Sequence, residues 1–144
     1  MPFDALKAAD NRFSHDIICE KTLLYVFMKV PKDTIVAKIY DLLKVTIPML
    51  EGLPRSQRFT LGDRIQNHIS DLLESAISAY YQPANEKRPI LFQSNIRLEM
   101  LRYYFRLAYE RGYYNSIKYK DFSERIDEIG RMIGGWIKSL PETK

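Results

Sequence analysis

Apolar side chains recur at helical spacing four times between residues 33 and 140 of this 144-residue chain. Positions three and four residues apart share one face of a helix, so each repeat predicts an amphipathic helix. The first stripe consists of Ile35, Ile39, Leu42 and Met49, and it is widened by Val36, Leu43 and Ile47. The other three consist of Leu61, Ile65, Leu72, Ala76 and Tyr80; of Leu98, Leu101, Phe105 and Ala108; and of Phe122, Ile126, Ile129, Ile133, Trp136, Ile137 and Leu140. No strand-like alternation interrupts them, and the predicted fold class is all-α.

Prolines and a glycine mark the predicted helix ends. Pro48 removes a backbone donor and indicates a kink or the last turn of the first helix. The run QPANEKRP (82–89) breaks the chain, and Pro89 suits the first turn of the third helix, which ends at Gly112. The fourth helix begins near Ser116. Four helices of 17 to 25 residues with short loops predict an antiparallel, up-down-up-down four-helix bundle.

Residues 1–30 differ from the rest of the chain and are predicted to form an N-terminal extension of uncertain structure. The four-helix bundle domain is predicted to span residues 31–144. Within the extension, the run TLLYVFMKV (22–30) is apolar and strand-like. Two interpretations stay open: either Met28 is the true start of the protein and the upstream residues come from an over-extended gene, or the extension is an additional docking segment.

Composition excludes several classes of protein. The longest apolar run, Leu23–Met28, has six residues, far short of the roughly 20 that a membrane span requires. Cys19 is the single cysteine, so no intrachain disulfide can form and a cytoplasmic location is expected. His15 and His68 lack partners at metal-ligand spacing, and we expect neither a metal nor another cofactor.

The segment DEIGRMIGGWIK (127–138) carries three glycines inside a predicted helix, where each lowers helix stability by about 1 kcal/mol relative to alanine. A helical projection places Gly130 and Gly134 beside the apolar stripe, which predicts close approach of a neighbouring helix. Gly135 projects outward, where it gains nothing from the core of its own bundle. We therefore expect it to meet another copy of the chain. The predicted oligomer interface consists of Gly135, Gly134, Gly130 and Trp136.

Three blocks of the chain resemble the accessory variability determinant (Avd) family, which belongs to diversity-generating retroelements of bacteria and phages. The blocks are PRSQRFTLGDRI (54–65), LRYYFRLA (101–108) and IDEIGRMIGGWIK (126–138). The resemblance covers roughly residues 33–140, and the last block is the most specific part of it.

The resemblance implies a four-helix bundle that assembles into a homopentameric barrel and has no enzymatic activity of its own. It implies binding to the retroelement reverse transcriptase and to nucleic acid, the template RNA above all and DNA as a further candidate. This binding supports mutagenic cDNA synthesis and retrohoming. Proteins encoded in intervening sequences of 23S ribosomal RNA genes share the bundle, so an RNA-binding or structural protein of that type is the alternative function.

The net charge of +4 lies wholly in residues 31–144, where 18 basic face 14 acidic side chains. That balance permits a polyanionic partner without requiring one. Symmetric assembly repeats the basic groups, which favours steeply salt-dependent binding of nucleic acid. The residues expected to bind nucleic acid or the reverse transcriptase are Arg102 and Arg106 first, Arg131 and Lys138 second, and Arg55, Arg58 and Arg64 third, with Arg97 and Arg111 on the opposite flank of the third helix.

A structural role is the alternative for the arginines of the third helix. They flank its apolar stripe rather than form one outward face, and such arginines often pair with acids on adjacent helices. The outermost positions of this helix in projection are Glu99, Tyr103 and Glu110. The tyrosines that interleave with the charge are candidates for base stacking, although packing is their more frequent role in bundles. They are Tyr103, Tyr104, Tyr109, Tyr113, Tyr114 and Tyr119.

One enzyme class offers a comparable pair of residues. Arg64 and His68 resemble the arginine and histidine of small helical RNases of the HEPN class. Those enzymes separate the pair by a longer stretch than the three residues that intervene here, and their usual additional polar residue is not identifiable. Because no activatable nucleophile or acid–base pair stands at workable spacing elsewhere, we expect no enzymatic activity.

Overall fold

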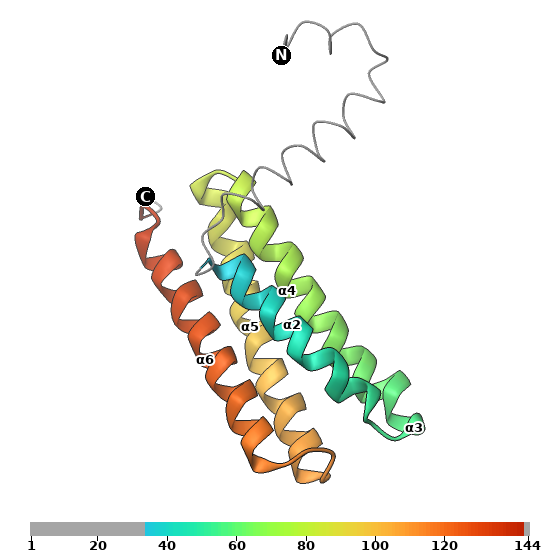
Figure 1. The fold of residues 1–144 in the computed structure, drawn as a ribbon. Coiled ribbons are helices and arrows are strands. Elements are labelled where there is room, and N and C mark those ends of the chain that lie inside the picture. Colours follow the sequence, from blue (N-terminus) through green and yellow to red (C-terminus); the bar gives the residue numbers. More distant parts are fainter. Residues whose placement is uncertain (1–33, 143–144) are drawn as a thin grey trace, which may run out of the picture. The chain divides into compact units, whose positions relative to one another are not determined.

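The computed structural model describes residues 34–142, whose regular structure is helical throughout (Figure 1). The elements are α2 (Ile35–Glu51), α3 (Arg55–Gln57), the π-helical turn η2 (Arg58–Gly62), α4 (Asp63–Tyr81), α5 (Ala84–Glu110) and α6 (Ser116–Ser139). Helices α2 and α5 each pack against both α4 and α6. Successive long helices run antiparallel (Figure 1), so the predicted all-α class is confirmed and the described residues form an up-down-up-down bundle.

The bundle begins with a capped helix. The hydroxyl of Thr34 accepts a hydrogen bond from the backbone N–H of Ala37 at 3.3 Å, which satisfies one of the free donors at the start of α2. Pro48 lies in the last turn of α2, one of its two predicted roles. The predicted extension, residues 1–30, lies outside the described residues. The domain boundary at residue 31 therefore stays a prediction.

Helical residues run without a break from Arg55 to Tyr81, but they include one wide turn, η2. The turn brings the adjacent residues Leu61 and Gly62 into the core together. A β-carbon at Gly62 would lie 3.4 Å from Cδ1 of Leu53, so this turn packs against the preceding connection. A π turn inserts a residue into the helical repeat, which is why the apolar periodicity did not predict it.

The predicted start of the third helix was wrong. Helix α5 begins at Ala84, five residues before Pro89. The carbonyl of Pro83 accepts the backbone N–H groups of Glu86 and Lys87 at 3.0 and 2.9 Å, and these bonds start the helix. Pro89 therefore lies in the second turn of α5 rather than the first.

Two predicted core positions are also exposed. Ile47 is 41% and Tyr80 is 50% exposed. The inward position near Ile47 is taken by Thr46, whose buried hydroxyl donates to the carbonyl of Leu42 at 2.7 Å. A threonine can hold a core position when its hydroxyl bonds to the preceding turn, and an apolar pattern cannot show this.

The connection between α5 and α6 follows the prediction closely. Helix α5 ends just before Gly112, whose φ of 76° lies in the left-handed region that glycine adopts without strain. The N–H of Tyr113 donates to the carbonyl of Ala108 at 3.0 Å, closing the helix end. The side-chain oxygen of Asn115 accepts the N–H of Lys118 at 2.9 Å and caps α6.

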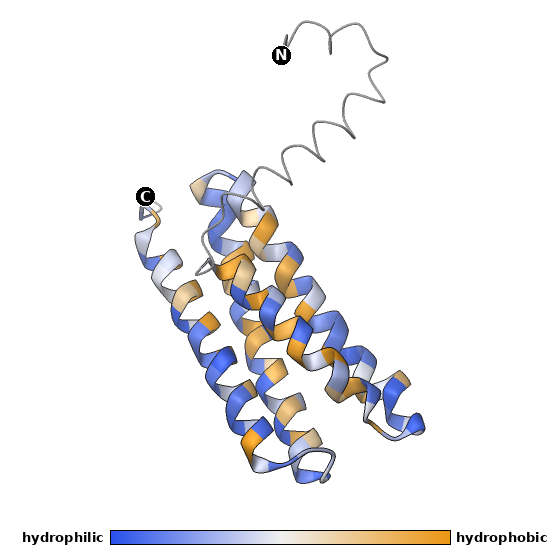
Figure 2. Cartoon of the chain, in the orientation of Figure 1, coloured by the Kyte–Doolittle hydropathy of each residue, from blue (hydrophilic) through white to orange (hydrophobic). Residues whose placement is uncertain are grey.

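The core lies between the helices, where their apolar positions converge (Figure 2). Phe105 and Phe122 stack there, with ring centroids 4.5 Å apart. Tyr114 is 9% exposed, and its hydroxyl donates a hydrogen bond to the carbonyl oxygen of Phe105. Burial of the hydroxyl raises the pKa of Tyr114. These contacts fasten the loop between α5 and α6 to the core.

Candidate nucleic-acid interface

Arg102, one of the two arginines ranked first from the sequence, is held between α5 and α6. Its Nη1 donates a hydrogen bond to Oδ1 of Asp127, and its Nε lies 3.1 Å from Oε1 of Glu99. The second contact is an ion pair without hydrogen-bond geometry, because Nε has no hydrogen-bond partner in the described part of the chain. Two carboxylates therefore offset the charge of this guanidinium.

A polar groove of about 480 Å³ surrounds this cluster. Its lining residues are Asn95, Leu98, Glu99, Arg102, Asp127, Gly130 and Arg131. A β-carbon at Gly130 would lie 3.4 Å from Nη2 of Arg102 and 3.9 Å from Cδ1 of Leu98, so this glycine faces its own bundle. The charges of the two arginines and two carboxylates among these residues cancel, so the groove has little attraction for a phosphate backbone.

Arg97 is also turned toward a neighbouring helix. Its Nη1 donates to Oγ of Ser75 at 3.0 Å, and its Nε lies 3.8 Å from Oδ2 of Asp71, both on α4. Arg97 and Arg102 thus connect α5 to the two helices that flank it. These contacts match the structural role considered for the arginines of this helix.

Arg106 has a different environment, although it was predicted together with Arg102. It pairs with Glu110 one turn further along α5, with Nε 2.7 Å from Oε1. The two side chains are 62% and 54% exposed. The hydrogen bond that Arg106 donates to the carboxylate of Glu110 raises the pKa of Arg106. A pair this exposed is weak, so Arg106 stays accessible to other anions.

Positive charge is concentrated at one end of the described bundle. Residues 44–64, between α2 and α4, and residues 106–121, between α5 and α6, together hold eight basic and four acidic side chains. The other described residues hold eight basic and nine acidic ones. Both connections lie at the same end of an antiparallel bundle, and we call this region the basic end. Its basic side chains are Lys44, Arg55, Arg58, Arg64, Arg106, Arg111, Lys118 and Lys120.

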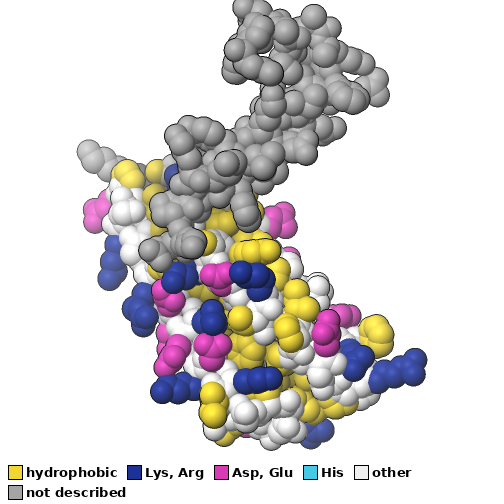
Figure 3. Space-filling model, in the orientation of Figure 1, with side chains coloured by type: hydrophobic (Ala, Val, Ile, Leu, Met, Phe, Trp, Pro, Cys, Tyr) yellow, Lys and Arg dark blue, Asp and Glu magenta, His cyan; other side chains and the backbone are white. Residues whose placement is uncertain are grey.

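Several cations of the basic end are free of acidic partners. Arg55, Arg64 and Arg111 are exposed, and they form no ion pair with any residue of the described range. Nε of Arg58 donates to the carbonyl of Leu53 at 2.9 Å, which holds its guanidinium over the α2–α3 connection. Figure 3 shows basic side chains projecting at the α3 end, whereas basic and acidic side chains are interspersed along α6.

Most of the tyrosines considered for base stacking make contacts within the bundle. The rings of Tyr109 and Tyr119 stack face to face with centroids 4.6 Å apart, and Tyr104 packs against the ring of His68 at 5.3 Å. Phe59, on η2, was not predicted as a stacking residue, yet 75% of it is exposed at the basic end. It is therefore a better placed platform for a base than these tyrosines.

The outward face of α6 lacks side-chain bulk where two of the three glycines lie. A β-carbon at Gly134 or Gly135 would meet no atom of the described part of the chain within 4 Å, apart from the neighbouring backbone of α6. Arg131 and Lys138, on either side of them along α6, are exposed and have no ion-pair partner among residues 34–142. Gly134 therefore does not make the close helix contact expected for it within the described bundle.

Trp136 packs inside the described chain. Its ring lies 4.8 Å from the ring of Tyr80, and Nζ of Lys87 lies 5.8 Å from its centroid. These contacts place it against the α4–α5 end, away from the face that Gly135 occupies. Its predicted place in an oligomer interface stays a prediction.

An apolar stripe on the outer face of α5 was missed by the sequence analysis. It consists of Phe92, Ile96, Met100, Tyr103 and Leu107, which are 37% to 66% exposed. The spacing of four, four, three and four residues is itself a helical signal, on the face opposite the core stripe. Among the outermost positions predicted for this helix, Glu99 and Glu110 border the stripe and Tyr103 belongs to it.

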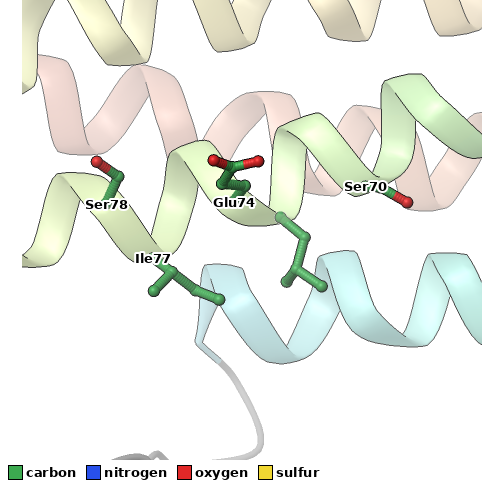
Figure 4. A pocket seen from close by; sticks show the side chains of 5 residues that line it. Ser70, Glu74, Ile77 and Ser78 are labelled. Carbon is green, nitrogen blue, oxygen red and sulfur yellow. The ribbon is translucent and has the colours of Figure 1, made fainter. Parts of the chain in front are cut away.

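A second hollow, of about 360 Å³, lies on α4 beside α2 (Figure 4). It is lined by Ser70, Leu73, Glu74, Ile77 and Ser78. Its one charged side chain is acidic, which does not suit a polyanion.

Arg64 and His68, the pair considered for an RNase, are in contact through the backbone carbonyl of Arg64 and the ring of His68. Nδ1 of His68 lies 3.0 Å from the carbonyl oxygen of Arg64, a contact within one helical turn. Among residues 34–142, no three His, Cys, Asp or Glu side chains are grouped closely enough to hold a metal. No helix in that range has the length and apolar character needed to cross a membrane.

The fold and its surface define a small helical bundle with a basic end. A family model described as bAvd-like matches residues 34–140, and the chain belongs to this family. The match confirms the resemblance to accessory variability determinants, and it indicates an accessory, non-catalytic protein that associates with the components of a diversity-generating retroelement. No curated protein and no solved structure matches the chain.

Proposed function

We propose that this chain is a nonenzymatic adaptor that brings the reverse transcriptase of a diversity-generating retroelement together with its template RNA. In this role it supports mutagenic cDNA synthesis and retrohoming in the cytoplasm. Membership of the bAvd-like family supports the accessory role. The observation that carries the RNA contact is the basic end, where eight basic side chains face only four acidic ones.

The RNA backbone binds, in this proposal, to the exposed cations of the basic end. Arg55, Arg64 and Arg111 contribute most, since no carboxylate of the described range competes for them, and Arg106 joins them by exchanging Glu110 for a phosphate. Phe59 supplies an open ring for a neighbouring base. Arg97 and Arg102 act indirectly, by holding α5 against α4 and α6.

Self-association strengthens this weak site by repetition. We propose that copies of the chain meet through the outer face of α6 at Gly134 and Gly135, and that the assembly is the homopentamer implied by the family resemblance. The support is that, outside the backbone of α6 itself, no described residue comes within 4 Å of where either β-carbon would be. A ring of identical bundles presents one basic end per subunit, so several phosphates are bound together and affinity rises through multivalency.

RNA binding by a basic-end variant tests the proposal. Arg64→Gln/Arg111→Gln removes two cations that have no ion-pair partner in the described range. Lys87→Gln/Arg88→Gln is the matched control, because it removes the same charge at the start of α5, at the end of the bundle opposite the basic end. Fluorescence anisotropy with single-stranded template RNA should show at least a tenfold loss for the first variant and a small change for the control. The slope of log affinity against log salt should fall by about 0.7 for each phosphate that the variant no longer binds. Equal losses in both variants would exclude the basic end as the binding surface.

Binding to the polymerase is measured separately. The purified chain should retain the retroelement reverse transcriptase on an affinity resin in nuclease-treated extract. Retention that disappears after nuclease treatment would show that RNA alone bridges the two proteins, and it would remove the adaptor part of the proposal.

A further inference from the structure

We infer that the apolar stripe on the outer face of α5 binds a second copy of this chain, which presents the outer face of α6 around Gly134 and Gly135. The inference rests on the self-association proposed above and names the surface that the glycine face receives. It concerns the stripe residues Phe92, Ile96, Met100, Tyr103 and Leu107.

The stripe is unusual for a surface helix. A helix that packs on one side of a small bundle normally turns polar side chains outward, whereas α5 is apolar on two opposite faces. The five side chains extend over 16 residues of helix, about 22 Å from the first to the last at the α-helical rise. At roughly half exposure they present on the order of 500 Å² of contiguous surface, a size typical of a binding site.

The exposed area of the stripe is large enough for a contact with another protein chain. A stable interface between proteins covers about 800 Å² on each partner, so the stripe supplies more than half of one side. The bordering polar residues of α5 supply the rim, as in other interfaces.

The outer face of α6 is complementary to the stripe in shape. Bulky side chains such as Phe92 and Ile96 need a surface that another helix can approach closely. Gly134 and Gly135 offer one, because outside their own helical backbone no atom of residues 34–142 lies within 4 Å of either β-carbon position. Two adjacent glycines in an exposed helix weaken that helix, and close packing against another copy offsets this loss.

The two faces are also complementary in charge. Glu99 and Glu110 border the stripe and remain 64% and 54% exposed despite their ion pairs on α5. Arg131 and Lys138 border the glycines and have no ion-pair partner within the described bundle. An acidic rim on one copy therefore meets a basic rim on the next, which orients the two chains relative to each other.

The arrangement of the helices determines what such a contact builds. α5 and α6 occupy adjacent corners of the four-helix bundle, so their outward faces point roughly at right angles to each other. A contact between two different faces is head-to-tail, and it repeats from copy to copy. If each copy is rotated by roughly a right angle relative to the one before it, about four or five copies close a ring instead of extending a filament.

Light scattering on the full chain tests the inference with two variants. Phe92→Glu/Ile96→Glu places charge on the stripe, far from the basic end, and Gly135→Leu adds bulk to the receiving face. Both positions are exposed, so circular dichroism should show unchanged helicity. Each variant should shift from the wild-type mass to that of a single chain at micromolar concentration. The control Gln66→Glu/Asn67→Asp adds two charges to an exposed part of α4 and should keep the wild-type mass.

Mixing the two variants distinguishes a head-to-tail contact from other arrangements. The stripe variant keeps an intact α6 face and the glycine variant keeps an intact stripe, so an equimolar mixture should yield a dimer and nothing larger. A mixture that remains monomeric overturns the inference, as does a stripe variant that retains the wild-type mass.

These outcomes are separable from those of the adaptor proposal. If wild-type chain is oligomeric but the stripe variant assembles normally, only the inference about α5 fails. If wild-type chain is monomeric, the inference and the ring both fail, while RNA binding by the basic end is judged from its own salt-dependent titration.

Discussion

The guanidinium of Arg102 on α5 donates a hydrogen bond to the carboxylate of Asp127 on α6. Both residues lie in blocks of sequence that carry the family resemblance, and the structure joins them across the interface of two helices. The β-carbon position of Gly130, one turn after Asp127, lies 3.4 Å from Nη2 of Arg102, so the same guanidinium also lies beside this glycine. The blocks therefore encode at least one contact that stabilises the bundle itself.

Replacing Arg102 should consequently affect stability more than RNA affinity. Arg102→Gln and Asp127→Asn should each lower the free energy of unfolding, and their coupling in a double-mutant cycle should be about 1 kcal/mol, because the pair is partly exposed. Urea denaturation at fixed protein concentration measures both quantities. Arg106→Gln is the control, and it should leave stability nearly unchanged while weakening RNA binding. An Arg102 variant of full stability that no longer binds RNA would contradict this assignment.

Tyr114 should contribute to stability through its buried hydroxyl. Tyr114→Phe removes the hydrogen bond to the carbonyl of Phe105 and should destabilise the chain by about 1 kcal/mol. The neighbouring Tyr113→Phe, at a partly exposed position, is the matched control and should have little effect. Equal effects in thermal or urea unfolding would mean that the hydroxyl of Tyr114 is not the stabilising group.

The same residue predicts a loss of stability in alkaline solution. Burial raises the pKa of Tyr114 above its ordinary value of 10, so the native state keeps its proton where the unfolded state begins to lose it. Its contribution is fully present below pH 10 and falls as the pH rises beyond that value, by about 1.4 kcal/mol per pH unit. Unfolding of wild type and Tyr114→Phe between pH 9 and 11 should show a shallower decline for the variant. Parallel curves would contradict the assignment.

Two glycines should respond to alanine in opposite ways. Gly112 has a φ of 76°, so Gly112→Ala should destabilise the chain by about 1 kcal/mol through backbone strain. Gly130→Ala gains helix propensity and brings its methyl group into ordinary contact with Arg102, so stability should be equal or higher. Urea midpoints of both variants compare them directly. A loss at Gly130 as large as that at Gly112 would show that the groove cannot accept a methyl group.

Much of the fold followed from the sequence because its signals are local. Helix type and helix order came from apolar spacing, and the end of α5 came from the glycine at 112. The sequence did not predict the π turn at η2 or the start of α5 before Pro89. Each depends on backbone hydrogen bonds that side-chain patterns do not encode.

The candidate site was harder to predict than the fold. A helical projection placed Arg102 and Arg106 on the same flank of α5, yet one faces two carboxylates and the other faces solvent. Both arginines have a carboxylate partner on α5 itself, so the difference comes from Asp127 on α6, which only the assembled bundle brings to Arg102. The gathering of charge at the basic end likewise follows from topology, since it joins residues 44–64 and 106–121. The stripe on the outer face of α5, by contrast, follows from spacing alone, because its apolar residues recur every three or four positions on the face opposite the core.

In our proposal, the chain supports cDNA synthesis by presenting template RNA at its basic end to the reverse transcriptase. The most direct measurement is cDNA yield from a retroelement that lacks its own copy of this gene, complemented with wild type, with Arg64→Gln/Arg111→Gln or with the control Lys87→Gln/Arg88→Gln. We predict that wild type and the control restore cDNA, and that the basic-end variant yields at least tenfold less at equal protein level. Full yield from the basic-end variant, or full yield with no complementing gene, would contradict the account.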